Sequence, residues 1–153
     1  MKQKKKNIEI KDKLINHLVN KGKKNKSETI ILKSLKTLQI TSKKSSKKLC
    51  QLAFVSSTPI FKINTITQKK RKKKKQKAKI IPAFISNKTS RISFAIKFIL
   101  KNVKRKKHSL LFHGLTNEIL MSSQNKSQSI ETKKESQKQA FSNRHLFKYY
   151  RWH

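Results

Sequence analysis

The 153-residue chain carries 41 Lys and Arg side chains against six Asp and Glu side chains, a formal net charge of +35, and its hydrophobic share is 34%. A compact body with so many like charges repels itself, so we expect order only beside a large polyanion, with nucleic acid the first candidate and an anionic membrane the weaker one. Six scattered carboxylates offer no pair for acid–base chemistry, and Cys50 is alone, so we predict no enzymatic activity, no small-molecule substrate, no cofactor and no metal.

The predicted fold class is mainly α, a bundle of about six helices with a protruding basic β-hairpin. We expect a basic N-terminal arm at residues 1–10 and a single helical RNA-binding domain at residues 11–153. The hairpin is placed at about residues 60–86. Candidate RNA contacts in the arm are Lys4, Lys5 and Lys6.

Two amphipathic helices are expected after the arm. The apolar residues of the first have helical spacing, and Gly22 is expected to end it: Leu14, Ile15, Leu18 and Val19. The second is expected to begin with a capping box from Asn25 to Glu28 and to bury one apolar face: Ile30, Ile31, Leu35 and Leu38. The loop between them holds Lys23 and Lys24, which either contact phosphates or are simply solvated.

A third helix is expected at residues 49–55, after a polar linker at residues 41–48. Alternation at Phe61 and Ile63 then predicts a strand, and Pro82 limits the following strand to a sheet edge. The tip between the strands holds nine cations, suited to neutralising phosphates rather than reading bases. The alternative is a solvated loop or a nuclear-localisation-like cluster. The tip residues are Lys69, Lys70, Arg71, Lys72, Lys73, Lys74, Lys75, Lys77 and Lys79.

Helical spacing returns after the hairpin. A helix is predicted from Arg91 to Val103, with Ser90 as its N-cap, and another over residues 110–120. Residues 124–139 are expected to form a loop and an exposed helix. The longest apolar run, residues 92–100, is interrupted by charge and is too short to cross a membrane. Candidate RNA-binding residues here are Arg91, Lys97, Lys104, Arg105 and Lys106.

The C-terminus combines aromatic and cationic residues. Its candidate RNA-binding residues are Arg144, Tyr150, Arg151 and Trp152. Aromatic rings beside cations can stack on unpaired bases, or they can pack against the protein core. For Phe147, packing on the helical core is the favoured interpretation. For Tyr150 and Trp152, base stacking and core packing are equally favoured.

Two ordered sets of residues carry a resemblance to a known family. The first is Gly22-Lys23-Lys24 followed by Glu28 and Ile30. The second and larger set is Arg91, Ala95, Lys97, Phe98, Ile99, Ser109, Leu115, Asn117-Glu118, Lys133-Lys134, Glu135, Phe147 and Tyr150-Arg151-Trp152. Together they resemble the universal small-subunit ribosomal protein seven family, in its bacterial and organellar type, and the first set is similar to that family's basic loop and second helix.

The resemblance implies a structural constituent of the small ribosomal subunit. Such a protein binds the 3′ major (head) domain of small-subunit rRNA, nucleates head assembly, and contacts neighbouring head proteins. Its hairpin lies near the E-site tRNA and the mRNA exit. The alternative from a different class is a basic DNA-compacting or anionic membrane-surface protein.

The amino-acid composition indicates in which compartment the protein is made. Phe occurs eight times, Gly and Pro twice each, and lysine far outnumbers arginine, as A/T-rich codons produce. We therefore predict an organelle-encoded protein of the mitochondrial small subunit, with a plastid or a bacterial cytoplasm as alternatives.

Overall fold

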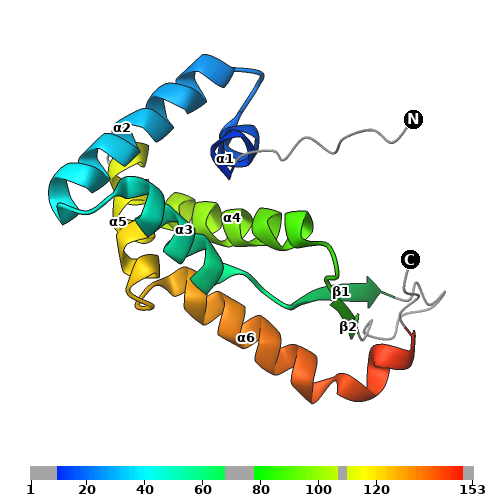
Figure 1. Cartoon of the computed structure of the whole chain (residues 1–153). Helices are drawn as coiled ribbons and strands as arrows, with labels where there is room; N and C mark the ends of the chain where they lie inside the picture. The colour runs from blue at the N-terminus through cyan, green and yellow to red at the C-terminus, as the bar shows by residue number, and fades with distance from the viewer. Residues whose placement is uncertain (1–9, 68–77, 107–109, 150–153) are drawn as a thin grey trace, which may run out of the picture.

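Six α-helices and one β-hairpin make up the computed structural model, which describes residues 10–67, 78–106 and 110–149 (Figure 1). This confirms the predicted mainly α class with a hairpin. In chain order the elements are α1 Ile10–Leu18, α2 Lys24–Ser42, α3 Ser46–Ser57, β1 Phe61–Thr67, β2 Ala78–Phe84, α4 Lys88–Arg105, α5 Leu111–Ser123, α6 Gln128–Ser142 and the short 3-10 helix η1 Arg144–Tyr149.

The hydrophobic core lies between the first five helices. Burial of apolar side chains on the facing sides of these helices is the main term that stabilises them, at roughly 25 cal/mol per Å². The apolar faces predicted for α1, α2 and α4 all contribute. The buried cluster is Leu14, Ile15, Leu18, Ile31, Leu38, Leu49, Ala53, Phe54, Ile96, Ile99, Leu100, Val103, Leu115 and Ile119.

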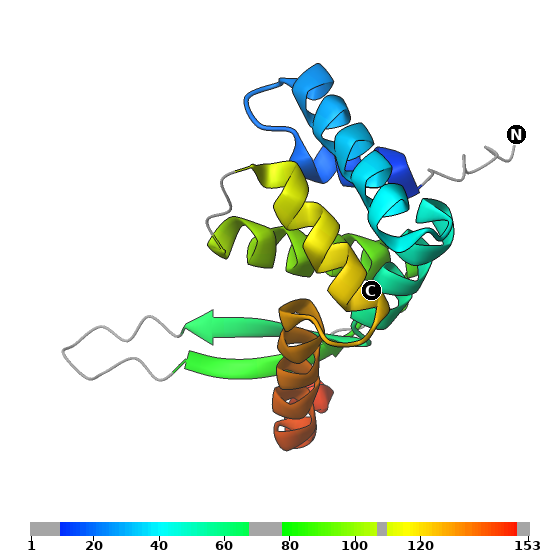
Figure 2. The same ribbon diagram turned by 90° about the vertical axis from the view of Figure 1, so that its left-hand side faces the viewer.

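The hairpin is an antiparallel pair that projects from the helices (Figure 2). Phe61 lies opposite Phe84, and Pro82 lies opposite Ile63. Both strands of a two-stranded sheet are edges, which is where proline is tolerated. The predicted hairpin and the position of its proline are therefore confirmed.

Arg91 fastens the base of the hairpin to α4. Its Nε donates a hydrogen bond to the Ile85 carbonyl at 2.6 Å, and its guanidinium lies 5.1 Å from the centre of the Phe84 ring. The backbone N–H of Ile85 in turn donates to the Ile60 carbonyl at 3.0 Å. These contacts fix the direction in which the strands leave the helical body.

A buried carboxylate organises the turn between α5 and α6. Glu118 is 2% exposed and accepts hydrogen bonds from the backbone N–H of Ser129, at 3.2 Å, and from the Ser129 hydroxyl. Lys106, at the end of α4, places its Nζ 3.5 Å from the same carboxylate. The Ser127 hydroxyl caps α6 by accepting from the Ile130 N–H. Residues 124–127 thus form the predicted loop, and the predicted helix is α6, which begins at Gln128, is anchored to α5 and ends at Ser142.

Two predicted features of the α1–α2 connection are wrong. Helix α1 ends at Leu18 rather than at Gly22, because Lys21 and Gly22 adopt left-handed backbone angles, with φ of 50° and 72°. Helix α2 begins at Lys24 with no side-chain cap, so the capping box does not form. Glu28 is instead paired with Lys11 of α1 at 3.7 Å.

The predicted start of α4 is also wrong. The helix begins at Lys88, and Asn87 is the N-cap, with its side-chain oxygen accepting from the Thr89 N–H at 2.9 Å. Ser90 therefore lies inside the first turn. An asparagine carboxamide satisfies the free N–H groups of a helix start as well as a serine hydroxyl does.

The buried carboxylate gives a stability prediction. Changing Glu118→Ala should lower the free energy of unfolding by about 1–3 kcal/mol, because it leaves the buried Ser129 N–H without its acceptor. Urea unfolding followed by far-UV circular dichroism, in about 1 M NaCl to screen self-repulsion, measures the change. The exposed Glu131→Ala is the control and should change stability by less than about 0.5 kcal/mol. Equal effects of the two changes would contradict the assignment.

Candidate nucleic-acid interface

Helix α4 carries a stripe of exposed cations on the side away from the core. Lys97, Lys101, Lys104 and Arg105 are all exposed, and their spacing of three to four residues places them on one side of the helix. The opposite side is held by buried Ile96, Ile99 and Val103. The stripe is therefore presented by a rigid element rather than by a loop. Lys101 was not among the RNA-binding residues predicted from the sequence, although its position four residues after Lys97 indicates the same side of the helix.

Helix α1 extends the cationic stripe. Lys13 Nζ donates to the Thr89 carbonyl at the start of α4, at 3.3 Å. The pKa of His17 is lowered first by partial burial and then by the positive charges of Lys97 and Lys13. His17 therefore experiences cations from both helices, and α1 and α4 act as one electrostatic surface.

The connection between α1 and α2 adds further cations. Lys21, Lys23 and Lys24 are exposed around Gly22, whose positive φ permits the tight turn. Figure 2 shows that this connection, the end of α4 and the hairpin all lie toward the same side of the molecule. We call the described part of this surface the basic face; it consists of Lys13, His17, Lys21, Lys23, Lys24, Lys97, Lys101, Lys104 and Arg105.

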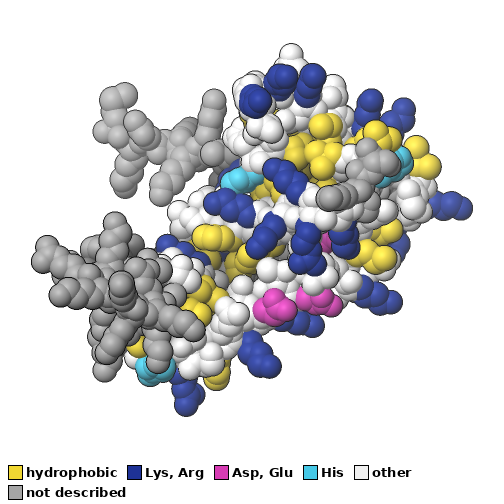
Figure 3. Space-filling model, turned by 180° about the vertical axis from the view of Figure 1, so that it is seen from behind, with side chains coloured by type: hydrophobic (Ala, Val, Ile, Leu, Met, Phe, Trp, Pro, Cys, Tyr) yellow, Lys and Arg dark blue, Asp and Glu magenta, His cyan; other side chains and the backbone are white. Residues whose placement is uncertain are grey.

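Carboxylates do little to neutralise the basic face. Two ion pairs are present among the residues that the structure describes, Lys11–Glu28 and Lys106–Glu118, and neither uses a cation of the basic face. Figure 3 looks at the molecule from the side opposite to Figure 1 and shows many Lys and Arg side chains but few acidic ones. Such a surface attracts phosphates by charge and releases their counterions.

Four predicted RNA-binding cations have intramolecular contacts; one of them, Lys97 of the basic face, places its Nζ 5.4 Å from the centre of the Phe94 ring on the same helix. Arg91 is bound to the base of the hairpin, as described above, and Lys106 is paired with Glu118. Arg144, in η1, lies 5.8 Å from the centre of the Phe141 ring and is not part of the basic face. The positioning role of Arg91 was missed, because its partners Phe84 and Ile85 are identified only by the three-dimensional structure.

Many of the predicted RNA-binding residues lie outside the residues that the structure describes. Of the hairpin cations, Lys79 lies within β2, opposite Ile66 of β1. The following lie outside the described residues: Lys4, Lys5, Lys6, Lys69, Lys70, Arg71, Lys72, Lys73, Lys74, Lys75, Lys77, Tyr150, Arg151 and Trp152. Their RNA contacts remain predictions.

Phe147 is half-buried against the hairpin. Its ring centre lies 5.4 Å from that of Phe61 in β1, so it contacts the hairpin rather than the helical core. The predicted packing on the helical core is therefore wrong in its partner, which is a ring of the hairpin. Phe61 also contacts Phe84 edge-on, with 6.0 Å between the ring centres, so three aromatic rings gather at the base of the hairpin.

A known protein family matches most of the chain. The sequence profile of the family described as ribosomal protein S7p/S5e matches residues 1–144. No curated protein matches the chain. Within the described residues no helix is both long enough and apolar enough to cross a bilayer. The match favours ribosomal RNA over DNA or an anionic membrane as the polyanion.

The stripe on α4 predicts a salt-dependent contact. Changing Lys101→Gln should weaken rRNA binding and reduce the slope of log K against log[salt] by roughly 0.7–0.9, the contribution of one phosphate contact. Filter binding to small-subunit rRNA across a series of KCl concentrations measures the slope. The matched control is Lys47→Gln, because Lys47 is exposed on α3 and lies outside the basic face. A slope that falls with the control but not with Lys101→Gln would contradict the assignment.

His17 predicts a pH dependence of binding. Its lowered pKa means that in the RNA-free protein less than half of His17 is protonated at pH 6.5. Because the unfolded chain then binds more protons than the folded one, folding stability falls as the pH drops below that value. Phosphates beside Lys13 and Lys97 should restore the pKa, so RNA binding takes up a proton. The affinity of the wild-type protein for rRNA should therefore rise as the pH falls below 6.5, by up to about tenfold per unit of pKa change.

The variant His17→Gln should lose this rise, whereas His145→Gln, in η1, should keep it. Fluorescence anisotropy with labelled rRNA over a pH series at constant ionic strength measures both. The same pH profile in wild type and His17→Gln would refute the proton uptake.

Proposed function

The chain belongs to the ribosomal protein S7p/S5e family, and we propose that it binds the 3′ major (head) domain of small-subunit rRNA and nucleates assembly of the head. As a member of this family it is a structural, rRNA-binding protein of the small ribosomal subunit, and the family is not one of enzymes. The 3′ major domain and the role in assembly come from the residue pattern that resembles the family.

The observation that carries the proposal is the basic face. Its cations come from α1 and α4, whose apolar sides form part of the core, and from the connection between α1 and α2. Packing therefore fixes the separations of the backbone positions that carry the cations of α1 and α4. Lysines at fixed separations recognise the spacing of phosphates in a folded RNA, and this selects RNA shape rather than base sequence.

We further propose that the hairpin reaches the E-site tRNA and the mRNA exit. Its strands leave the helical body on the side of the basic face, and Arg91 together with three packed aromatic rings fixes their direction. The nine cations from Lys69 to Lys79 are proposed to neutralise phosphates of this second RNA. Lys4–Lys6 and the C-terminal Tyr150, Arg151 and Trp152 are proposed as further rRNA contacts.

The proposed location is the mitochondrial small subunit, in an organelle that encodes this chain. The supporting observation is residue usage typical of A/T-rich codons. Detection of the protein in small subunits purified from mitochondria, and not from plastids of the same cells, supports it.

The rRNA assignment is tested with two RNA fragments. The wild-type protein should bind a transcript of the 3′ major domain at least about tenfold more tightly than a transcript of the 5′ domain of similar length at the same salt concentration, because only the first presents the matching phosphate arrangement. Filter binding measures both affinities. Equal affinities would mean charge attraction without selection and would contradict the proposal.

The same experiment includes a variant with all nine tip cations changed to Gln. If the tip contacts tRNA rather than the head rRNA, this variant should retain the preference for the 3′ major domain. Small subunits reconstituted with it should then bind deacylated tRNA more weakly. Unchanged tRNA binding would contradict the proposed contact between the hairpin and the E-site tRNA, and it would not affect the rRNA assignment.

A further inference from the structure

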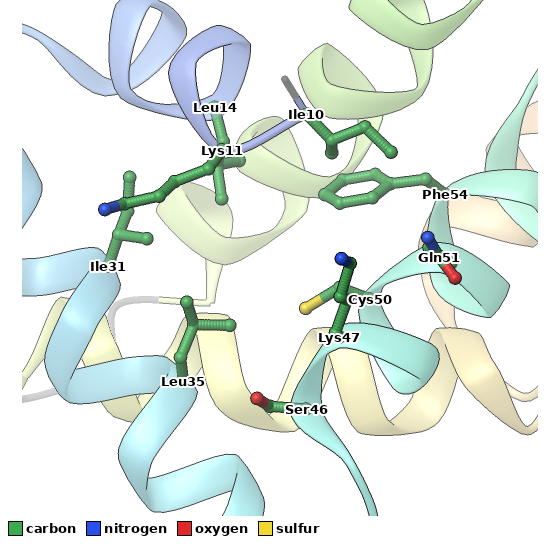
Figure 4. Close-up of a pocket in the computed structure, with 10 residues that line it drawn as sticks. All are labelled: Ile10, Lys11, Leu14, Ile31, Leu35, Ser46, Lys47, Cys50, Gln51 and Phe54. Atoms are coloured by element: carbon green, nitrogen blue, oxygen red, sulfur yellow. The ribbon is translucent and has the colours of Figure 1, made fainter.

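Helices α1, α2 and α3 enclose an apolar groove that the RNA-binding role does not use. Its volume is about 480 Å³, within the roughly 300–1,000 Å³ typical of ligand sites. Figure 4 shows side chains from all three helices directed toward the space between them. The apolar lining consists of Ile10, Leu14, Ile31, Leu35, Cys50 and Phe54.

The lining of the groove is suited to apolar ligands. Ile31 and Phe54 belong to the buried core, so the walls of the groove are held in place by packing. Burial raises the pKa of the Cys50 thiol to about 11, so Cys50 is neutral at physiological pH and behaves as a small hydrophobic residue. A phosphate would find no partner on these walls, although cations stand at the rim, so an apolar segment fits the inside of the groove better than the RNA backbone does.

Part of the lining of the groove lies away from most of the basic face. In Figure 2 the first turn of α1 and helix α3 lie on the side opposite to the hairpin and the end of α4. An rRNA bound at the basic face therefore leaves the groove accessible. A second macromolecule can occupy it at the same time.

The rim of the groove is cationic. Lys47 of α3 is exposed, and Lys11 of α1 has a side chain that is 42% exposed beside Glu28. A second copy of this chain is excluded as occupant by the mutual repulsion of two bodies at +35. The chain's own first nine residues carry four lysines and a single acid, Glu9, so they match the rim poorly.

We infer that this groove binds an amphipathic segment of a neighbouring small-subunit protein, in which apolar side chains are flanked by Asp or Glu. The apolar side chains fill the groove, and this supplies most of the affinity. The flanking carboxylate approaches Lys47, and since exposed pairs contribute little energy, it mainly selects the orientation of the segment. The protein would then join rRNA on one side to a protein on the other.

Cross-linking in reconstituted small subunits tests this inference. A photo-cross-linking amino acid replaces Gln51, an exposed residue on the rim, or Lys101 on the basic face as the matched control. Gln51 should cross-link to a peptide of another small-subunit protein that contains both apolar and acidic residues, identified by mass spectrometry. Lys101 should cross-link to rRNA, so failure of the groove and failure of the basic face are distinguishable.

Charge variants complete the test. Lys47→Glu should lower the yield of the Gln51 cross-link at least about fivefold, whereas Lys47→Arg should preserve it and Lys134→Glu, on α6, should not change it. Any of four results would overturn the inference: a Gln51 cross-link to rRNA, one to residues 1–9 of this chain, one to a second copy, or no cross-link while Lys101 still reacts with rRNA.

Discussion

Repulsion among unpaired cations is the constraint on which the rest of this structure depends. The net charge is +35, and the described residues contain two ion pairs, one of them between exposed groups. The apolar cluster is confined to the inner sides of five helices, so the cations are displaced to the outside and away from one another. A core of this size does not cancel the repulsion, whereas a folded RNA does, because its phosphates supply opposite charge at matching distances.

Within that constraint, a few polar contacts determine the shape of the binding surface. Glu118 joins α4, α5 and α6 through Lys106 and Ser129, and Arg91 joins α4 to the hairpin. Both contacts use charged groups to hold elements in position rather than to contact a partner. Because they fix the end of α4 and the direction of the strands, they set the relative positions of the basic face and the hairpin.

The fold was predictable to the extent that apolar periodicity governs it. The spacing of Leu14, Ile15 and Leu18, and of Ile96, Ile99 and Val103, was sufficient to identify helices and their buried faces. Helix starts were less predictable, because a cap depends on local backbone angles: Asn87 caps α4, and α2 has no side-chain cap. Among candidate site residues, Lys97, Lys104 and Arg105 were predicted from charge and lie exposed on α4. The contacts of Arg91 and Lys106 were not predictable, because they join neighbouring elements whose relative positions only the folded chain shows. The groove was not predictable, since three helices must meet to form it.

The most direct test of the central claim is far-UV circular dichroism of the isolated protein, heated in dilute buffer, in increasing salt, and with the 3′ major domain transcript. The midpoint of unfolding should be low or absent in dilute buffer, should rise as salt screens the repulsion, and should rise further when the transcript is added at low salt. A high midpoint in dilute buffer that neither salt nor rRNA changes would contradict the account.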